Sequence, residues 1–315
     1  EVGPPFGWCM DVVLVGSIAY DSVASPEGEV ANMLGGSATY GGLASSFHCN
    51  RLGLGTVGLV GVVGTDFRDE DRMVLVSNGA DVSGIETADG ETFRWEGAYH
   101  GSMAEAETKA THLNVFEHFQ PNVPSHAQTP KITLCANLHP ALQASVLDQT
   151  KAQRLTMLDS MNLWINIARE ELLDVMKRVD LIIINDGEVR MLANDENLIR
   201  AAQTVKSMTE VSTLVVKRGE HGVLAFHGQH IIALPAFPTA KVCDPTGCGD
   251  TFAGTLAAYL ALGEGPIDRD ELRAALVAST VSASFTLESF GVEALLGMSE
   301  DAFDARIVEF ERILG

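Results

Sequence analysis

Residues Asp244–Leu260 read DPTGCGDTFAGTLAAYL, a glycine-rich turn that leads directly into a helix of small and apolar residues. The first N–H groups of a helix have no partner within the helix, and together with the helix dipole they bind negative charge. Gly247 and Gly249 let the backbone approach an oxyanion closely. The carboxylate of Asp250 would repel a resting phosphate, so we expect it to accept a proton from an attacking hydroxyl. The stretch therefore predicts a phosphate-handling site.

The composition is that of an ordinary globular enzyme. The chain has 315 residues, of which 46% are hydrophobic, and it is long enough to bury a large core. It contains no run of about 20 apolar residues that could cross a membrane, and the opening EVGPPFGWCM lacks the pattern of a secretory signal. We therefore expect a cytoplasmic protein with no membrane partner. The formal net charge of −21 disfavours a nucleic-acid partner, and five scattered cysteines suggest no disulfide framework.

Strand and helix patterns alternate along the chain. Asp11–Gly16 is a β-branched run that predicts a buried first strand, and a helix of small residues is expected over 38–52. From Lys131 onward, apolar runs alternate with helical patterns, which is typical of a parallel sheet with crossover helices. Polar residues follow three of these strands, at Asn137, at Asp159 and Asn162, and at Asn185 and Glu188. Sites form at such strand ends, although these residues also cap helices.

A second, smaller sheet is predicted from residues 92–100, TFRWEGAYH. Its alternation places Phe93, Trp95 and Tyr99 on one face, as in a strand with two different sides. We infer a small antiparallel sheet inserted in the α/β body and built from approximately residues 22–34 and 92–116. Its aromatic face could cover a substrate, and packing against the core or a second subunit is an equal alternative.

Residues 53–58 match the dinucleotide-binding pattern G-x-G-x-x-G. In that fingerprint the glycines follow a strand and open a helix, but here they end a predicted helix and lead into the strand Val57–Val63. The order argues against a nicotinamide-dependent oxidoreductase, which is the alternative from a different class of enzyme. A P-loop enzyme is excluded because the chain has no G-x-x-x-x-G-K-[ST] motif.

Together these motifs resemble the ribokinase-like (PfkB) carbohydrate kinase family over nearly the whole chain. Residues 244–250, DPTGCGD, are similar to the family signature D-T-x-G-A-G-D. The resemblance implies that Asp250 is the catalytic base and that Gly247, Cys248 and Gly249 form the anion hole. It also implies a single kinase domain over residues 1–315 with a three-layer α/β/α fold and a mostly parallel sheet. The inserted sheet would then be a lid, which could also form a homodimer interface.

The resemblance implies roles for further residues. Asn185 and Glu188 look like the N-x-x-E motif that organises Mg²⁺ and phosphates. Their side-chain oxygens are the type of ligand that Mg²⁺ prefers, and they generally act through bound water. Asp21 falls on the aspartate that holds substrate hydroxyls, and a K⁺-like monovalent cation is implied near Thr246. The candidate substrate-binding residues are Asp21, Gly35, Gly36, Tyr40, Trp95 and Asn137, and the candidate nucleotide-binding residues are Asn185, Lys217, Gly219, Gly222 and Thr246.

These residues favour a magnesium- and ATP-dependent kinase that transfers the γ-phosphate to a hydroxyl of a sugar or polyol. A nucleoside kinase of the same family is the alternative, because the aromatic lid with Phe93 and Trp95 could stack a base. Tyr40 stands about where many sugar kinases carry an asparagine that contacts the sugar, which leaves the acceptor open. A phosphorylated sugar is less favoured, since few basic residues lie near the acceptor loops, and only Arg94 and Lys109 keep it open. A silent sugar-binding regulator is the third alternative, and the presence of Asp250 argues against it.

Overall fold

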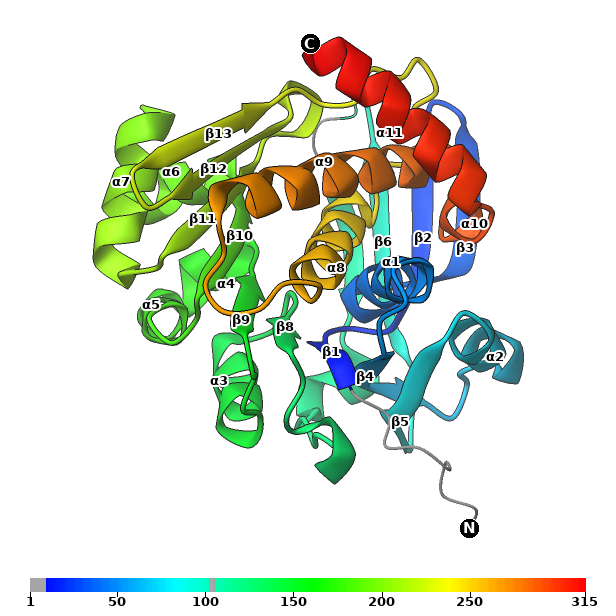
Figure 1. Ribbon diagram of the computed structural model, residues 1–315. Helices are drawn as coiled ribbons and strands as arrows, with labels where there is room; N and C mark the ends of the chain where they lie inside the picture. Colours follow the sequence, from blue (N-terminus) through cyan, green and yellow to red (C-terminus); the bar gives the residue numbers. More distant parts are fainter. Residues whose placement is uncertain (1–9, 102, 104–105) are drawn as a thin grey trace.

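A nine-stranded sheet forms the centre of the molecule (Figure 1). The computed structural model describes residues 10–101, 103 and 106–315, so Cys9 and most of the opening segment lie outside the described residues. The strand order is β13-β12-β11-β10-β9-β8-β1-β4-β5. The strands are β1 (Met10–Val15), β4 (Thr56–Gly64), β5 (Ala80–Ala88), β8 (Ile132–Cys135), β9 (Leu155–Asp159), β10 (Leu181–Asn185), β11 (Thr213–Lys217), β12 (Val223–His227) and β13 (His230–Leu234).

The sheet is parallel from β5 through β11, and the two antiparallel pairings are those of β12 with its neighbours β11 and β13. A parallel sheet is covered on both faces, so its strands are apolar throughout. In β1, Val12 and Leu14 join the core on one face, whereas Val13 and Val15 join the core on the other. The structure therefore confirms the predicted α/β fold with a mostly parallel sheet.

Helices cover both faces of the sheet (Figure 1). One face carries α1 (Ser37–Arg51), α8 (Cys248–Leu260) and α9 (Arg269–Thr286), with α10 (Glu293–Leu296) and α11 (Glu300–Leu314) packed outside α9, and α2 (Asp69–Ser77) lies against β5. The opposite face carries α3 (Pro140–Gln149), α4 (Asn162–Ile167), α5 (Arg169–Met176), α6 (Asp186–Ala193) and α7 (Leu198–Thr209). Among the described residues, no helix combines the length and the apolar character needed to cross a bilayer.

Helices α1 and α8 cross at very close range because small residues line their contact. A Cβ atom added to Gly254 of α8 would overlap the backbone of Gly41 in α1. Close packing of small residues is what the sequence of α1 predicts, and it holds α8 firmly between α1 and α9. The amino end of α8, which carries the glycine-rich turn, is therefore fixed relative to the sheet.

The second sheet has four strands in the order β3-β2-β6-β7. They are β2 (Ala19–Ser25), β3 (Gly28–Gly35), β6 (Phe93–Tyr99) and β7 (Ala106–His112). Both hairpins are antiparallel, but β2 and β6 pair in parallel, so the expectation of an antiparallel lid was wrong and the sheet is mixed. The reason is topological. β1 and β5 are parallel, so their carboxyl ends lie on the same side of the main sheet, and β2 and β6, which follow them in the chain, enter the lid in the same direction. The lid also begins at Ala19, before the expected residue 22.

Candidate active site

The glycine-rich turn opens helix α8 as the sequence predicts. Gly247 is the N-cap residue with φ 78°, and Cys248, Gly249 and Asp250 are the first three helical residues. The N–H of Cys248 donates to the carbonyl of Pro245 at 3.2 Å. Within the described part of the chain, the N–H groups of Gly247 and Gly249 have no acceptor, whereas the N–H of Asp250 donates to its own carboxyl group. The N–H groups of Gly247 and Gly249, rather than that of Cys248, are the ones free to bind an anion.

The carboxyl group of Asp250 lies in a buried and negatively charged environment. Burial raises its pKa to about 7, the nearby Asp159 adds to the increase, and Lys217 opposes it. A general base works best when its pKa lies near the working pH. The pKa of Asp250 thus lies in the range that suits a general base near neutral pH.

Tyr40 lies directly beneath the turn. Its side chain is 1% exposed, and a Cβ atom added to Gly247 would overlap three carbons of its ring. The ring therefore fits only against a glycine. The hydroxyl of Tyr40 is buried and has no hydrogen-bond partner among the described residues. An unpaired buried hydroxyl costs free energy, which is a reason to consider a ligand as its partner.

Asp21 approaches the same turn from the lid. Burial raises its pKa to about 7, the backbone N–H of Gly36 lowers it, and Asp244 and Asp250 raise it further. Gly35 makes room for this carboxylate, because a Cβ on Gly35 would overlap it, and Gly36 makes room for the backbone leading into the lid, because a Cβ on Gly36 would lie 2.5 Å from the carbonyl oxygen of Ser17. The structure therefore brings Asp21, Gly35 and Gly36 together beside Asp250.

The inner face of the lid is aromatic. Trp95 pairs with Asp21 across β2 and β6, so both side chains are on the same face of the sheet. The indole covers Gly97, where a Cβ would overlap it, and its Nε1 donates to Thr108 Oγ1 at 3.3 Å. Two residues beyond Gly97, the hydroxyl of Tyr99 accepts a hydrogen bond of 3.2 Å from Thr246 Oγ1. Thr246 thus ties the lid to the turn.

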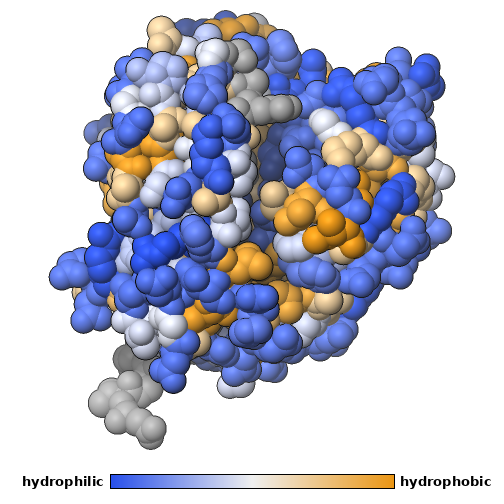
Figure 2. Space-filling model, turned by 180° about the vertical axis from the view of Figure 1, so that it is seen from behind, coloured by the Kyte–Doolittle hydropathy of each residue, from blue (hydrophilic) through white to orange (hydrophobic). Residues whose placement is uncertain are grey.

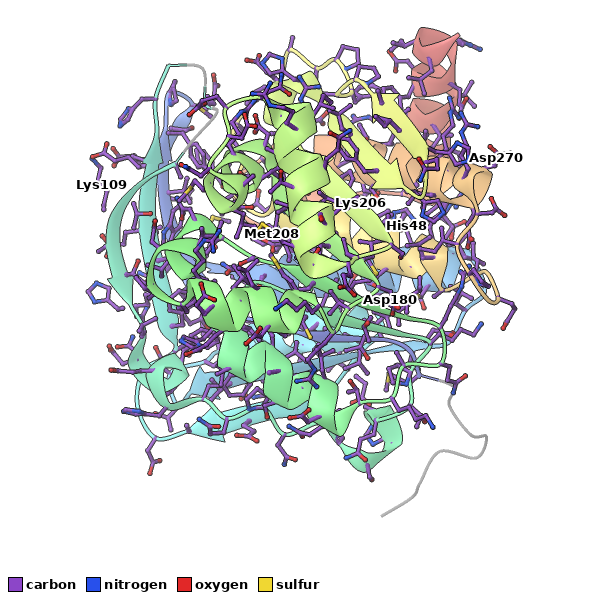
Figure 3. All side chains as sticks on the ribbon, turned by 90° about the vertical axis from the view of Figure 1, so that its left-hand side faces the viewer. His48, Lys109, Asp180, Lys206, Met208 and Asp270 are labelled. Carbon is purple, nitrogen blue, oxygen red and sulfur yellow. The ribbon has the colours of Figure 1, made fainter. Side chains whose placement is uncertain are left out.

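The basic residues of the lid do not reach this site. Arg94 lies next to Tyr20 and pairs with Asp66 at 2.5 Å. Lys109 pairs with Glu107 at 2.7 Å and projects away from the body of the molecule (Figure 3). Neither side chain can bind a phosphate group on the acceptor in this arrangement.

Asn185 and Glu188 form a capping box at the amino end of α6. The side chain of Asn185 accepts from Glu188 N at 2.8 Å, and the side chain of Glu188 accepts from Asn185 N at 2.7 Å. Glu188 is 5% exposed. It shares its surroundings with Asp159, and Lys217 supplies the positive charge near both. This excess of carboxylate oxygens suits a hard divalent cation, although no group of three such ligands occurs in the described residues.

Lys217 connects Asp159 to the glycine-rich turn. Its Nζ donates to Asp159 Oδ2 at 2.7 Å, and a Cβ on Gly249 would lie 3.1 Å from the same Nζ. Burial lowers the pKa of Lys217, but Asp159 and Glu188 raise it, with a net increase. Asp159 was not among the expected site residues. The signal available in the sequence was its place at the end of a predicted strand.

Three other expected residues, Asn137, Gly219 and Gly222, make contacts of their own. Asn137 accepts from Trp164 Nε1 at 2.9 Å and donates to Met161 Sδ at 3.1 Å, so its amide is held by α4 and the loop before it. Gly219 and Gly222 form the tight turn after β11, with φ 51° and 82°. No hydrogen bond of the described residues joins any of these three to Asp250.

The molecule is hollowed between the lid and the part of the body that carries α4–α6 (Figure 2). Hydrophilic residues lie inside the hollow. An opening of this kind beside the carboxyl ends of parallel strands is the usual location of ligands in α/β proteins.

Comparison with known proteins identifies the family. The profile of the pfkB family carbohydrate kinases matches residues 10–296. The chain belongs to this family. It is 31% identical over 257 residues to a cytidine kinase of Thermococcus kodakarensis, covering 79% of this chain and 88% of that protein.

Solved structures of this kinase family share the fold. A nucleoside kinase of Burkholderia thailandensis in complex with inosine superposes with a TM-score of 0.78 at 19% identity, covering 95% of this chain and 98% of the other. A putative ribokinase II of E. coli in complex with ATP and Mg²⁺ gives a TM-score of 0.75 at 18% identity, with 95% and 99% coverage. The ribokinase-like fold is thus confirmed, and the oxidoreductase alternative has no support from Gly53–Gly58, which end α1 and lead into β4.

Proposed function

We propose that this pfkB-family kinase transfers the γ-phosphate of ATP to a hydroxyl of a nucleoside, with cytidine as the first candidate. The observation that carries the proposal is the pairing of Asp21 with Trp95 on the inner face of the lid, beside Asp250. A carboxylate suits the hydroxyls of a ribose, and an indole suits the flat face of a base. The likeness to a cytidine kinase over most of both chains supports the same acceptor.

A free sugar or polyol, the acceptor favoured by the sequence motifs, would use the carboxylate but leave the indole without a planar partner. A phosphorylated sugar is disfavoured further, because Arg94 is held by Asp66 and Lys109 projects outward. The geometry therefore favours a neutral acceptor with an aromatic part.

The residues of the chain divide the chemistry among them. Asp21 orients the acceptor, whose hydroxyl attacks the γ-phosphorus in line while Asp250 accepts its proton. The bond from the γ-phosphorus to the bridging oxygen breaks, and ADP leaves with the electron pair. The free N–H groups at the start of α8 stabilise the negative charge on the phosphoryl group. Mg²⁺, when bound, would neutralise phosphate charge, and Glu188 with Asn185 would hold it.

The test is ADP release from ATP and Mg²⁺ with a panel of acceptors: cytidine, uridine, adenosine, inosine, ribose, fructose and inositol. We expect turnover with a nucleoside and a kcat/KM at least about tenfold above that of ribose, since the base adds contact area. The variant Asp250→Asn removes the general base and should lower kcat by about a hundred- to ten-thousandfold.

A matched control is Asp270→Asn. Asp270 is also a carboxylate in the first turn of a helix, α9, but it is exposed and far from the turn (Figure 3). This variant should keep wild-type activity. Turnover of sugars alone would refute the nucleoside acceptor, and absence of turnover with every acceptor would refute the kinase proposal. A fully active Asp250→Asn would refute the role of Asp250 as general base.

A further inference from the structure

The partly buried ion pair of Lys217 and Asp159 lies at the carboxyl ends of the strands of the main sheet. Asp159 ends β9 and Lys217 ends β11, so the bond between them crosses over the end of β10, which separates the two strands. Neighbouring strands lie about 4.8 Å apart, and the lysine side chain has to extend along the sheet edge to bridge two such gaps. The pair therefore fixes the ammonium group at one place on that edge.

The ammonium group lies at the glycine-rich turn. A Cβ atom on Gly249 would be 3.1 Å from Lys217 Nζ, and the N–H of Gly249 is one of the free donors at the start of α8. An anion bound by this N–H group would also be within reach of the ammonium group. Two independent donors, one from the backbone and one from a side chain, thus converge on the same position.

The hydrogen bonds of Lys217 leave capacity for a ligand. An ammonium group has three donors, and Asp159 is its single acceptor among the described residues. The Lys217 side chain is 20% exposed, whereas that of Asp159 is 5% exposed, so the open side of the pair belongs to the lysine. The remaining donors have no acceptor among the described residues and are available to a ligand.

Stability alone does not account for the pair. Burying two charges is costly, and apolar residues of similar volume often serve a fold as well or better. Apolar residues in place of Lys217 and Asp159 would leave the neighbouring carboxylates without a positive charge, because Glu188 and Asp250 also interact electrostatically with Lys217. An anion entering among three carboxylates needs a positive group to receive it.

We propose that Lys217 binds the γ-phosphate of ATP and neutralises the phosphoryl group during transfer, and that Asp159 is the positioning residue that holds it there. This inference rests on the proposed ATP-dependent function. Lys217 is then a catalytic residue in contact with the transferred group, not only a part of the nucleotide-side turn. Asp159 acts through Lys217 and touches no substrate atom.

The test compares the dissociation constants of ADP and of AMP-PNP, a non-hydrolysable ATP analogue, measured by calorimetry with Mg²⁺ and without acceptor. In Lys217→Met the preference for AMP-PNP over ADP should fall by about ten- to a hundredfold, the range for one charge-assisted hydrogen bond. The dissociation constant of ADP should change by less than about threefold. Asp159→Asn should shift the preference in the same direction by a smaller factor.

The double variant Asp159→Asn/Lys217→Met tests the coupling. If Asp159 acts only through Lys217, the double variant should have the same preference as Lys217→Met, because effects within one contact are not additive. The double variant also lacks both charges of the pair, so neither charge is left without its partner. It can therefore be measured even if a single variant fails to fold.

Controls come from the opposite ends of the same strands. Lys206→Met removes a lysine that contacts Ser212 just before β11, and Asp180→Asn removes a carboxylate that contacts Thr156 in β9 (Figure 3). Neither should change the preference. An unchanged preference in the Lys217 variants, or equal weakening of the binding of both nucleotides, would overturn this inference and leave the proposed function intact. A wild type that binds neither nucleotide would overturn the proposed function with it.

Discussion

Gly247→Ala tests the contact between the turn and Tyr40. Gly247 has φ 78°, a conformation that costs an L-residue about 1–2 kcal/mol. The new methyl group would also overlap three ring carbons of Tyr40, where a normal carbon contact is about 3.5–4.0 Å. Tyr40 is 1% exposed and cannot swing into solvent.

The two effects add to a sizeable loss of stability. Overpacking a core costs about 1–3 kcal/mol, so with the backbone strain we expect a loss of about 2–5 kcal/mol in the free energy of unfolding. For a chain of this size each kcal/mol lowers the melting temperature by about 2–4 °C. The variant should therefore melt about 4–20 °C below the wild type, and kcat should fall because the free N–H groups are displaced.

Thermal unfolding by circular dichroism and urea titration measure the change. Gly297→Ala is the control, since Gly297 has a negative φ of −81° and a Cβ there would lie 3.4 Å from its nearest neighbour, the carbonyl oxygen of Glu293. It should stay within about 0.5 kcal/mol of the wild type. In the double variant Gly247→Ala/Tyr40→Ala the overlap is gone, so its loss should be about 1–3 kcal/mol smaller than the sum of the single losses. Strict additivity, or a Gly247→Ala variant as stable as the wild type, would refute the packing argument.

Two further predictions concern Tyr40 and the pH dependence. Tyr40→Phe removes a buried hydroxyl without a described partner, so the free protein should be as stable as the wild type or about 1 kcal/mol more stable. If the hydroxyl binds the acceptor, the KM for the acceptor should rise. Lower stability of the variant in denaturant titrations would show that the hydroxyl has a partner in the free protein. The pKa of Asp250 is raised by burial to about 7, and the base must be ionised, so log kcat/KM should rise with pH and level off above about 7; a flat profile between pH 5.5 and 8 would contradict this.

The sequence predicts those parts of the fold that depend on local patterns. The apolar runs of β1 and β4, the small residues of α1 and the turn before α8 are all found where they were expected. β5 was missed, because Gly84 interrupts it and charged residues occur along its length. The charged residues 68–72 carry no apolar pattern that would predict a helix, and they form the N-cap and the start of α2.

The site was harder to predict where it depends on contacts between distant segments. Asp250, Asp21 and the double glycine could be found by their motifs, and the Asn-x-x-Glu spacing also encodes a capping box. The bond between Asp159 and Lys217 depends on which strands flank β10, and no local pattern specifies that order. The position of Tyr40 beneath Gly247 likewise depends on how closely α1 and α8 approach. Strand order and helix packing are set by the whole chain.

The parallel pairing of β2 with β6 bears on the order of events during synthesis. The β2–β3 hairpin, which carries Asp21, leaves the ribosome well before β6 exists. A lone two-stranded hairpin is marginal in water, so this one stays unsupported until α1, β4, α2 and β5 have been made and β6 reaches it. A nascent chain therefore lacks the face on which Asp21 and Trp95 lie side by side. That face is a property of the assembled protein, formed when the two distant hairpins pair through β2 and β6.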